Sequence, residues 1–334
     1  MSAQRAGRSA EQEQFAVSLH DMLAAADVPG AARRWASGDH SDGLALWRKL
    51  AGAGVTALAV PEKWGGLGAS PLYLVAACEE LGHHALPGPV AESLAAVPAL
   101  LAALADAGEP WLARLAAGDL IATLAMPPRL PFAADTGAAG LVLLAEDGVV
   151  YRARLGATHQ SVDPARSLSE AHGGEVLARE AAGATAAALD LGALACSAQL
   201  LGAGRAMLEA SVRHASVRVQ FGRPVGGFQA VKHKLADVAI GLEFARPLLD
   251  AAAVALGDGS GTAGTGMAGR DVSAAKVACA DAAYRAARAA LQVHGAIGYT
   301  AEHDLSLWLA KVRALVPAWG SQAEHRARVV AGLT

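Results

Sequence analysis

The feature that most constrains the fold of this chain is the helix-type spacing of apolar residues in its last third. Six apolar residues there follow one another at steps of four and three: Val231, Leu235, Val238, Leu242, Ala245 and Leu249. This spacing places their side chains on one face of an α-helix. Aromatic residues make up only 4% of the chain, and much of its apolar content is alanine, which favours closely packed helices. Residues 183–334 are therefore predicted to form a helical bundle.

The rest of the chain divides into a helical part and a part with strand-like spacing. Helices are predicted within residues 11–27, 42–54, 71–84 and 90–106, where capping residues and prolines separate the apolar runs. Short apolar runs between Pro, Gly and Asp clusters then predict strands at residues 121–126, 140–146, 148–155 and 174–180. The expected fold is mainly α with a small β middle domain, divided into an N-terminal helical domain (1–119), a reduced β domain (120–182) and the bundle (183–334).

Composition excludes several classes of partner. The net charge is −3 and charged residues make up 18% of the chain, so neither nucleic acid nor an anionic membrane is expected as a partner. The N-terminus lacks the apolar core of a signal peptide. The most apolar window, residues 184–204, is interrupted by Asp190, Ser197 and Gln199. It is interpreted as a buried helix rather than a membrane span, and a cytoplasmic location is expected.

Three motifs that could carry chemistry occur in the wrong context. Residues 259–264 and 264–269 both match G-x-G-x-x-G, but they follow a predicted helix, whereas a dinucleotide site needs a preceding strand. They are interpreted as a loop between helices. His83 and His84 are neighbours that would point in different directions on a helix, so no metal site is predicted.

Two segments, residues 218–237 and 291–315, gather groups suited to a nucleotide. The first, RVQFGRPVGGFQAVKHKLAD, offers the guanidinium of Arg218, the ring of Phe221 and the amide of Gln229 around one turn. Such groups suit a diphosphate and a nucleotide ribose or base. The second offers the amide of Gln292 and closely approachable backbone at Gly295. The alternative is that both segments are ordinary loops with helix caps.

The pattern R-x-x-F-G-x-P-V-x-x-F-Q-x-V-x-H-x-L-A-D, followed by Q-x-x-G-x-x-G-Y, resembles the C-terminal domain of flavin-dependent acyl-CoA dehydrogenases. VPEKWGGLG (residues 60–68) and EELGHH (residues 79–84) are similar to the family's N-terminal elements, and DPARSL (residues 163–168) to a middle-domain segment of actinobacterial members. The resemblance covers most of the chain and follows the family's order. It implies an N-terminal helical domain, a β-domain and a C-terminal four-helix bundle.

The resemblance also implies FAD and a glutamate base. Members usually form tetramers in which each FAD lies between the β-domain of one subunit and the bundle of a neighbour. The base removes a proton from the α-carbon of an acyl-CoA thioester. It comes from a turn late in the bundle or from the first bundle helix, and these positions hold Trp319 and Gly192 in this chain. No catalytic residue is therefore predicted, although Asp190, two residues before the second position, is an alternative base.

The family's T-E-P-x-x-G-S-D and W-I-T elements, which hold the flavin ring, are missing from residues 120–160. The residues that would contact the ADP half of a neighbour's FAD remain, namely Arg218, Phe221, Gln229, Gln292 and Gly295, although Ala296 replaces a family glycine and Ala323 a glutamine. This combination resembles the non-catalytic subunit of actinobacterial α2β2 dehydrogenases that act on steroid side chains. FAD would be shared with a catalytic partner that also binds most of the acyl-CoA. The alternatives are a self-sufficient dehydrogenase that uses Asp190, and a flavin-free acyl-CoA-binding scaffold.

Overall fold

The computed structural model describes residues 7–104, 107–258 and 266–333. Helices form both ends of the chain and a sheet lies between them in sequence, so the predicted fold class is confirmed. The glycine pattern at residues 259–264 lies outside the described residues. The pattern at 264–269 lies partly outside them and ends in the first turn of a helix.

The N-terminal part consists of short helices: α1 (Ala10–Ala24), α2 (Val28–Ala36), α3 (Ser41–Gly52), α4 (Pro71–His83), α5 (Val97–Ala103) and α6 (Glu109–Ala117). Ser9 begins α1 with a reciprocal capping box to Gln12, and Ser70 caps α4 just before a proline at its first position. The helix expected at 90–106 is a π-helical turn, Glu92–Ala96, followed by α5. Residues 105–106 of that prediction lie outside the described residues.

The middle sheet has the order β1-β3-β4-β5-β2. Its strands are β1 (Ala122–Ala125), β2 (Ala133–Ala134), β3 (Leu141–Glu146), β4 (Val149–Gln160) and β5 (Ser167–Ala178). β1 and β3 are parallel and the other pairs antiparallel. β4 and β5 each extend over 12 residues, longer than their apolar runs predicted, and residues 155–160 of β4 are exposed.

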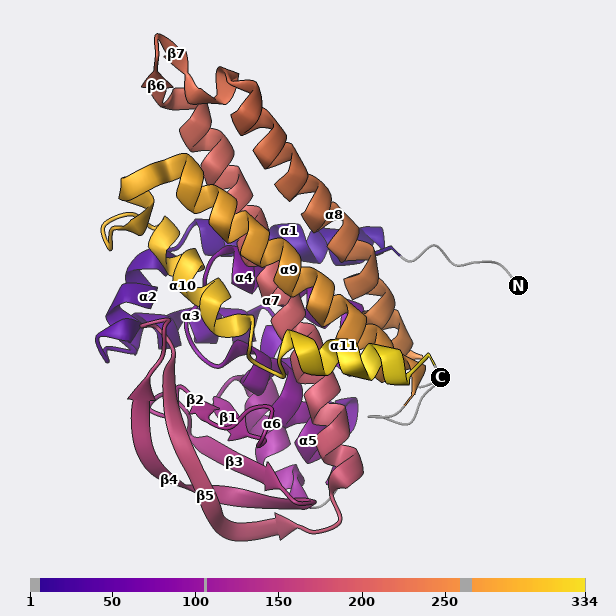
Figure 1. Ribbon diagram of the computed structural model, residues 1–334. Helices are drawn as coiled ribbons and strands as arrows, with labels where there is room; N and C mark the ends of the chain where they lie inside the picture. The colour runs from indigo at the N-terminus through magenta and orange to yellow at the C-terminus, as the bar shows by residue number, and fades with distance from the viewer. Residues whose placement is uncertain (1–6, 105–106, 259–265, 334) are drawn as a thin grey trace.

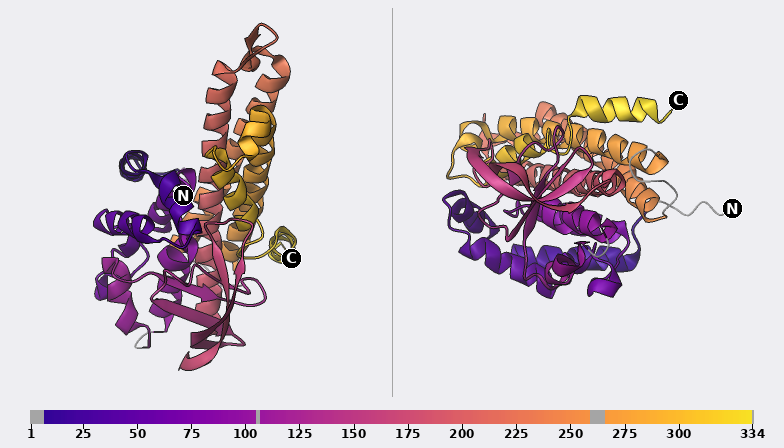
Figure 2. Two further views of the ribbon diagram at one scale, coloured as in Figure 1. Left: turned by 90° about the vertical axis from the view of Figure 1, so that its left-hand side faces the viewer. Right: turned by 90° about the horizontal axis from the view of Figure 1, so that it is seen from below.

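The C-terminal bundle contains α7 (Ala182–Val217), α8 (Gln229–Gly257), α9 (Met267–His294), α10 (Leu305–Leu315) and α11 (Gln322–Ala331). A hairpin of β6 (Val219–Gln220) and β7 (Arg223–Pro224) joins α7 to α8. Figure 1 shows α7 and α8 extending past the N-terminal helices, with this hairpin at their tip, while the sheet lies near the other end of α7. The two views of Figure 2 show the N-terminal helices and α9 on opposite sides of α7.

Helix α7 is the central helix of the molecule. It packs against α4 on one side and against α8 and α9 on the other. Glycines permit the close contact with α4, because a Cβ at Gly202 would lie 1.8 Å from the carbonyl oxygen of Glu79. By length and composition α7 could cross a membrane, but 83% of its most apolar window is buried inside the fold. This burial agrees with the predicted core helix.

The predicted apolar face of α8 is buried over only part of its length. Val238, Leu242, Ala245 and Leu249 are buried, whereas Val231 and Leu235 are half-buried. The N-terminal turns of α8 lie in the projecting part of the bundle (Figure 1). Fewer helices of this chain pack over the apolar face of α8 at these turns than farther along the helix.

Candidate functional site

The two positions predicted to lack a base contact one another. Gly192, in α7, lies under the ring of Trp319, and a Cβ at Gly192 would lie 2.3 Å from Cζ3 of the indole. Trp319 follows α10, adopts a positive φ of 66° and is completely buried. The indole therefore fills the space above Gly192, which the resemblance predicts as one base position, and Trp319 occupies the other predicted position. A glutamate at Gly192 would have no room while Trp319 is present.

The turn that presents Trp319 is held at both ends. Its carbonyl accepts a hydrogen bond from Nε2 of His325 at 2.9 Å. Ser321 then begins α11 with a reciprocal capping box to Glu324. Burial lowers the pKa of His325 to about 4, even though the bond to the Trp319 carbonyl acts in the opposite direction. The imidazole is therefore neutral at neutral pH and donates to the turn through Nε2.

Asp190 has a structural partner. Both oxygens of its buried carboxylate accept hydrogen bonds from Arg328, at 2.5 and 3.0 Å. Nη1 of Arg328 also lies 3.5 Å from Oγ of Ser273, and that hydroxyl lies 3.1 Å from Nδ1 of His325. The carboxylate thus belongs to a polar chain that runs from α7 through α11 and α9 to the Trp319 turn. A carboxylate engaged in this way is poorly placed to accept a proton from a substrate carbon.

The first predicted cofactor segment forms the exposed tip of the bundle. Arg218 ends α7, Phe221 is 92% exposed at the β6–β7 turn with a φ of 52°, and Gln229 begins α8. All three side chains are exposed. The ring of Phe228 lies under the guanidinium of Arg223, 4.0 Å from it, and rigidifies the hairpin. The structure therefore brings these three predicted residues to one accessible end of the bundle.

The second predicted cofactor segment lies beside the helices that carry the first. Gln292 is exposed in the last turn of α9, and its Oε1 accepts a hydrogen bond from Nζ of Lys234 in α8 at 2.7 Å. Gly295 follows α9 with a φ of 66°, and a Cβ there would meet no atom within 4 Å. Its backbone is therefore open to an incoming group. An exposed guanidinium, an aromatic ring, two amides and open backbone suit the ADP half of a dinucleotide.

Contacts between these segments were not predicted from the sequence. The rings of His214 and His294 contact each other at a tilt, with centroids 4.4 Å apart, which connects the last turns of α7 and α9. The Lys234–Gln292 hydrogen bond and the polar contacts from Arg328 through Ser273 to His325 also leave no signal in the local sequence. Each of them joins segments that lie far apart in the sequence. Only the helical period, which places Lys234 three residues after Val231 and four before Val238 on α8, could have suggested that a polar group flanks the apolar face.

Several polar groups of the middle domain are buried or hydrogen-bonded to one another. Oγ of Ser169 lies 2.7 Å from Oγ1 of Thr136 and 3.0 Å from Oγ1 of Thr158. Thr123 is completely buried, and Asp135 is buried with its pKa raised to about 6 by desolvation. These groups do not form an exposed row of donors for a flavin ring. The residues present in this domain fit a flavin cradle poorly, whereas those at the bundle tip fit the ADP half.

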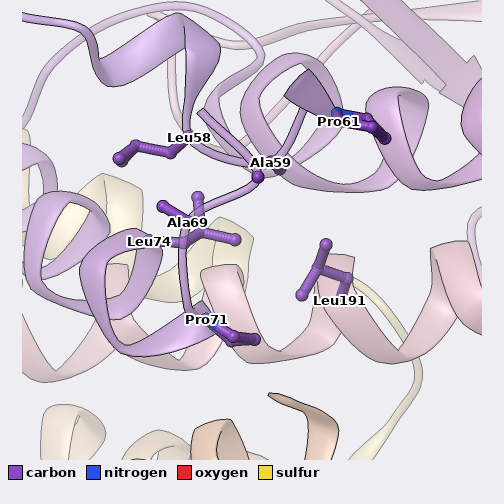
Figure 3. A pocket seen from close by; sticks show the side chains of 8 residues that line it. Leu58, Ala59, Pro61, Ala69, Pro71, Leu74 and Leu191 are labelled. Carbon is purple, nitrogen blue, oxygen red and sulfur yellow. The ribbon is translucent and has the colours of Figure 1, made fainter. Parts of the chain in front are cut away.

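An apolar pocket of about 260 Å³ lies on another side of α7. Its lining comes from the loop after α3, the start of α4 and one side chain of α7: Leu58, Ala59, Pro61, Gly68, Ala69, Pro71, Leu74 and Leu191 (Figure 3). The lining contains no acid, base or thiol. The pocket could take a small apolar group but could not transfer a proton.

Comparisons with known proteins agree with this architecture. Residues 182–334 match the model of the acyl-CoA dehydrogenase C-terminal domain, and residues 9–119 match the N-terminal domain. Acyl-CoA dehydrogenase IpdE2 of Mycobacterium tuberculosis is 30% identical over 304 residues, which are 90% of each chain. A five-stranded sheet between two helical parts, together with these matches, defines the class. The chain belongs to the acyl-CoA dehydrogenase family.

Solved structures share the fold across the whole chain. The ChsE4–ChsE5 complex from Mycobacterium tuberculosis aligns with a TM-score of 0.80 and 22% identity, covering 99% of this chain and 99% of that one. The Tcur3481–Tcur3483 steroid acyl-CoA dehydrogenase aligns with a TM-score of 0.80 and 22% identity, covering 97% of both chains. At this identity the likeness establishes the fold alone.

Proposed function

We propose that this chain is the non-catalytic subunit of a cytoplasmic α2β2 acyl-CoA dehydrogenase. Its bundle would supply contacts to the ADP half of an FAD whose flavin ring is held by the partner. The partner would also supply the glutamate base and bind most of the acyl-CoA. The observation that carries this proposal is the contact between Trp319 and Gly192, because one buried indole removes both places where the family positions a base.

The groups retained at the bundle tip support a role in trans. Arg218, Phe221 and Gln229 are exposed at one end, with Gln292 and Gly295 on the neighbouring helix end. A chain that had lost all cofactor contact would have no need of an exposed guanidinium and aromatic ring in this arrangement. When bound, FAD supplies the acceptor for the hydride that leaves the β-carbon of the acyl group. The residues of this chain would hold and orient its diphosphate and adenosine, and the proton would leave to the partner's glutamate.

An exposed apolar stripe on α8 supports packing against another subunit. Ile240, Phe244 and Leu248 recur every four residues and are 52%, 75% and 44% exposed. A spacing of four places them along one side of the helix. Large apolar side chains that gather on one helix face are typical of protein interfaces. This stripe lies on the same helix that begins at the proposed cofactor end.

Two related structures motivate the assembly and the substrate class. ChsE4–ChsE5 is described as a complex of two chains, and Tcur3481–Tcur3483 as a steroid acyl-CoA dehydrogenase. We extend both features to this chain: a partner of the same family and a bulky CoA thioester, such as that of a steroid side chain.

The apolar pocket beside Leu191 favours a second candidate function. A flavin-free subunit could hold an apolar group there without reacting with it, because the lining has no titratable side chain. That candidate predicts acyl-CoA binding by the isolated chain, measurable by calorimetry, without any effect of Arg218→Ala.

Expression of the chain alone and together with a catalytic acyl-CoA dehydrogenase subunit tests the first proposal. Flavin absorbance and acyl-CoA oxidation should appear in the co-purified complex, while the isolated chain is colourless and inactive. The catalytic chain expressed alone serves as the second control. An isolated chain that is yellow and oxidises acyl-CoA contradicts the proposal and restores Asp190 as the candidate base.

A further inference from the structure

Three histidines and a glutamate meet where α1 crosses the end of α4. One ligand atom each from His20, Glu80, His83 and His84 can be chosen so that all four lie within 4.8 Å of one another. The prediction that His83 and His84 point apart was wrong. Helix α4 ends at His83, and His84 lies just beyond it as the C-terminal cap, so its ring turns back to a centroid distance of 4.9 Å from that of His83.

Two of the distances between these atoms are close to those between the ligands of a tetrahedral metal ion. Nδ1 of His20 lies 3.0 Å from Oε2 of Glu80 and 3.2 Å from Nε2 of His84. A zinc ion with ligands at about 2.0–2.1 Å would separate its ligand atoms by about 3.3 Å. The three imidazole centroids lie 4.8, 4.9 and 5.0 Å apart. Three imidazoles on one tetrahedral ion would have centroids about 5 Å apart, by the same bond lengths.

Without an ion, the hydrogen-bonding needs of these atoms conflict. Nδ1 of His20 faces both a carboxylate oxygen and the Nε2 of His84. If Nδ1 carries a proton, one hydrogen is shared between two acceptors. If it carries none, its lone pair faces the carboxylate. A cation at the centre would accept a lone pair from all three atoms at once.

The fourth ligand is also available. Nε2 of His83 lies 3.0 Å from Oε2 of Glu209, and Nδ1 is buried with no hydrogen-bond partner among the described residues. His83 as a whole is 8% exposed. A histidine held by a carboxylate through one nitrogen and free at the other is the usual arrangement of a metal-bound imidazole. The remaining oxygen of Glu80 accepts from Arg205 at 3.0 Å, which leaves Oε2 for an ion.

A cavity gives access to the cluster. It has a volume of about 250 Å³, and His20, His83 and His84 line it together with Glu209, Arg213 and Trp308. Trp308 donates to the carbonyl of His83 at 2.8 Å and fixes the end of α4. The cluster is thus partly buried, rigid on one side and open on the other.

We propose that His20, Glu80, His83 and His84 bind a divalent transition-metal ion of the zinc class. Imidazole and carboxylate donors in a four-coordinate arrangement suit zinc. The ion would tie α1 to the end of α4 and displace any proton on Nδ1 of His20. This site involves no residue of the proposed cofactor end, so it stands or falls independently of the proposed function.

Zinc titration of the chain, purified without a polyhistidine tag and stripped by a chelator, tests the site. Calorimetry should show one saturable zinc site per chain, and Co²⁺ should give the intense visible absorption of a tetrahedral complex. Zinc should also raise the Tm, because an ion that binds only the folded state stabilises it. His20→Ala and His84→Ala should each weaken binding at least about tenfold. His233→Ala, on the exposed side of α8, is the matched control and should bind as the wild type does.

Circular dichroism of each variant shows whether it folds, and the half-exposed His20 offers a site where folding should survive substitution. Absence of saturable zinc binding in the wild type overturns the proposal. So does binding that persists unchanged in folded His20→Ala.

Discussion

Gly192 and Trp319 form a pair whose fit can be measured. A Cβ at Gly192 would overlap the indole, which is completely buried. We expect Gly192→Ala to destabilise the wild type by about 1–3 kcal/mol, the usual cost of overpacking. In a Trp319→Ala background the same change should be neutral or stabilising by up to about 1 kcal/mol, because alanine is the better helix former. Urea denaturation of the four proteins gives this double-mutant cycle.

Gly241→Ala is the matched control for that cycle. Gly241 also lies within a helix, but a Cβ there would meet no atom within 4 Å. Gly241→Ala should be neutral or stabilising in both the wild-type and the Trp319→Ala background. A cycle in which the Gly192→Ala penalty is unchanged by the loss of the indole would show that Trp319 does not fill the base position.

His325 makes the Trp319 turn sensitive to pH. Its pKa in the folded chain is about 4, below the ordinary value of 6.5, so the unfolded chain takes up this proton first as the pH falls. The stability that His325 contributes is present above pH 6.5 and is lost between pH 6.5 and 4. Between pH 6.5 and 4, we expect the free energy of unfolding of His325→Gln to fall by on the order of 2 kcal/mol less than that of the wild type. Denaturation at pH 7.5, 5.5 and 4 measures this difference. An exposed His233→Gln control should retain the wild-type slope, and an unchanged slope in His325→Gln would refute the assignment.

At the scale of elements, the contact between α4 and α7 is held by a buried charge. Glu79 is completely buried and accepts hydrogen bonds from Arg8, Arg205 and Arg246, at 2.6 to 2.8 Å. Burial alone would raise the pKa of Glu79, but the bonds to Arg246 and the charges of all three arginines lower it to about 2. Its contribution to stability is therefore present above pH 4.5 and is lost as the pH falls towards 2.

We expect Glu79→Gln to destabilise the chain by about 3–5 kcal/mol at pH 7, because three partly buried arginines would lose the buried carboxylate that they share. Glu243→Gln, at an exposed position on α8, should change stability by less than about 0.5 kcal/mol. Thermal denaturation at pH 7 and pH 3 distinguishes the two substitutions. The stability difference between the wild type and Glu79→Gln should shrink at the lower pH. A Glu79→Gln protein as stable as the control would contradict the role assigned to this charge.

Local patterns predicted the elements better than their arrangement. The helix periods and caps predicted α1, α3, α4 and the helical character of the bundle, since each of these is a local property. The parallel pairing of β1 with β3 and the full lengths of β4 and β5 depend on contacts between distant segments. For the same reason the sequence did not predict that His20, 64 residues before His84, would complete a cluster with it.

At the scale of the whole molecule, the two ends of the bundle serve different purposes in this account. Near the sheet, α7 is sealed by Trp319 and by the polar chain that binds Asp190. At the other end, α7 and α8 project beyond the N-terminal helices (Figure 1), and the predicted cofactor residues Arg218, Phe221 and Gln229 are exposed there. Family motifs in the sequence identified both sets of residues. That the predicted base positions are buried and the predicted cofactor residues exposed could be learned only from the structure, because burial depends on what packs over a residue.

The flavin content of the assembled complex tests the central claim most directly. Complexes of this chain with the proposed catalytic partner should contain one FAD for each pair of unlike chains, measured by flavin absorbance against protein concentration. Arg218→Ala should lower that ratio or the affinity for added FAD at least about tenfold, because it removes a charge-assisted contact to the diphosphate. Arg48→Ala, at an exposed position on α3, should leave it unchanged. One FAD on every chain, or full occupancy in a stable Arg218→Ala complex, would contradict the account.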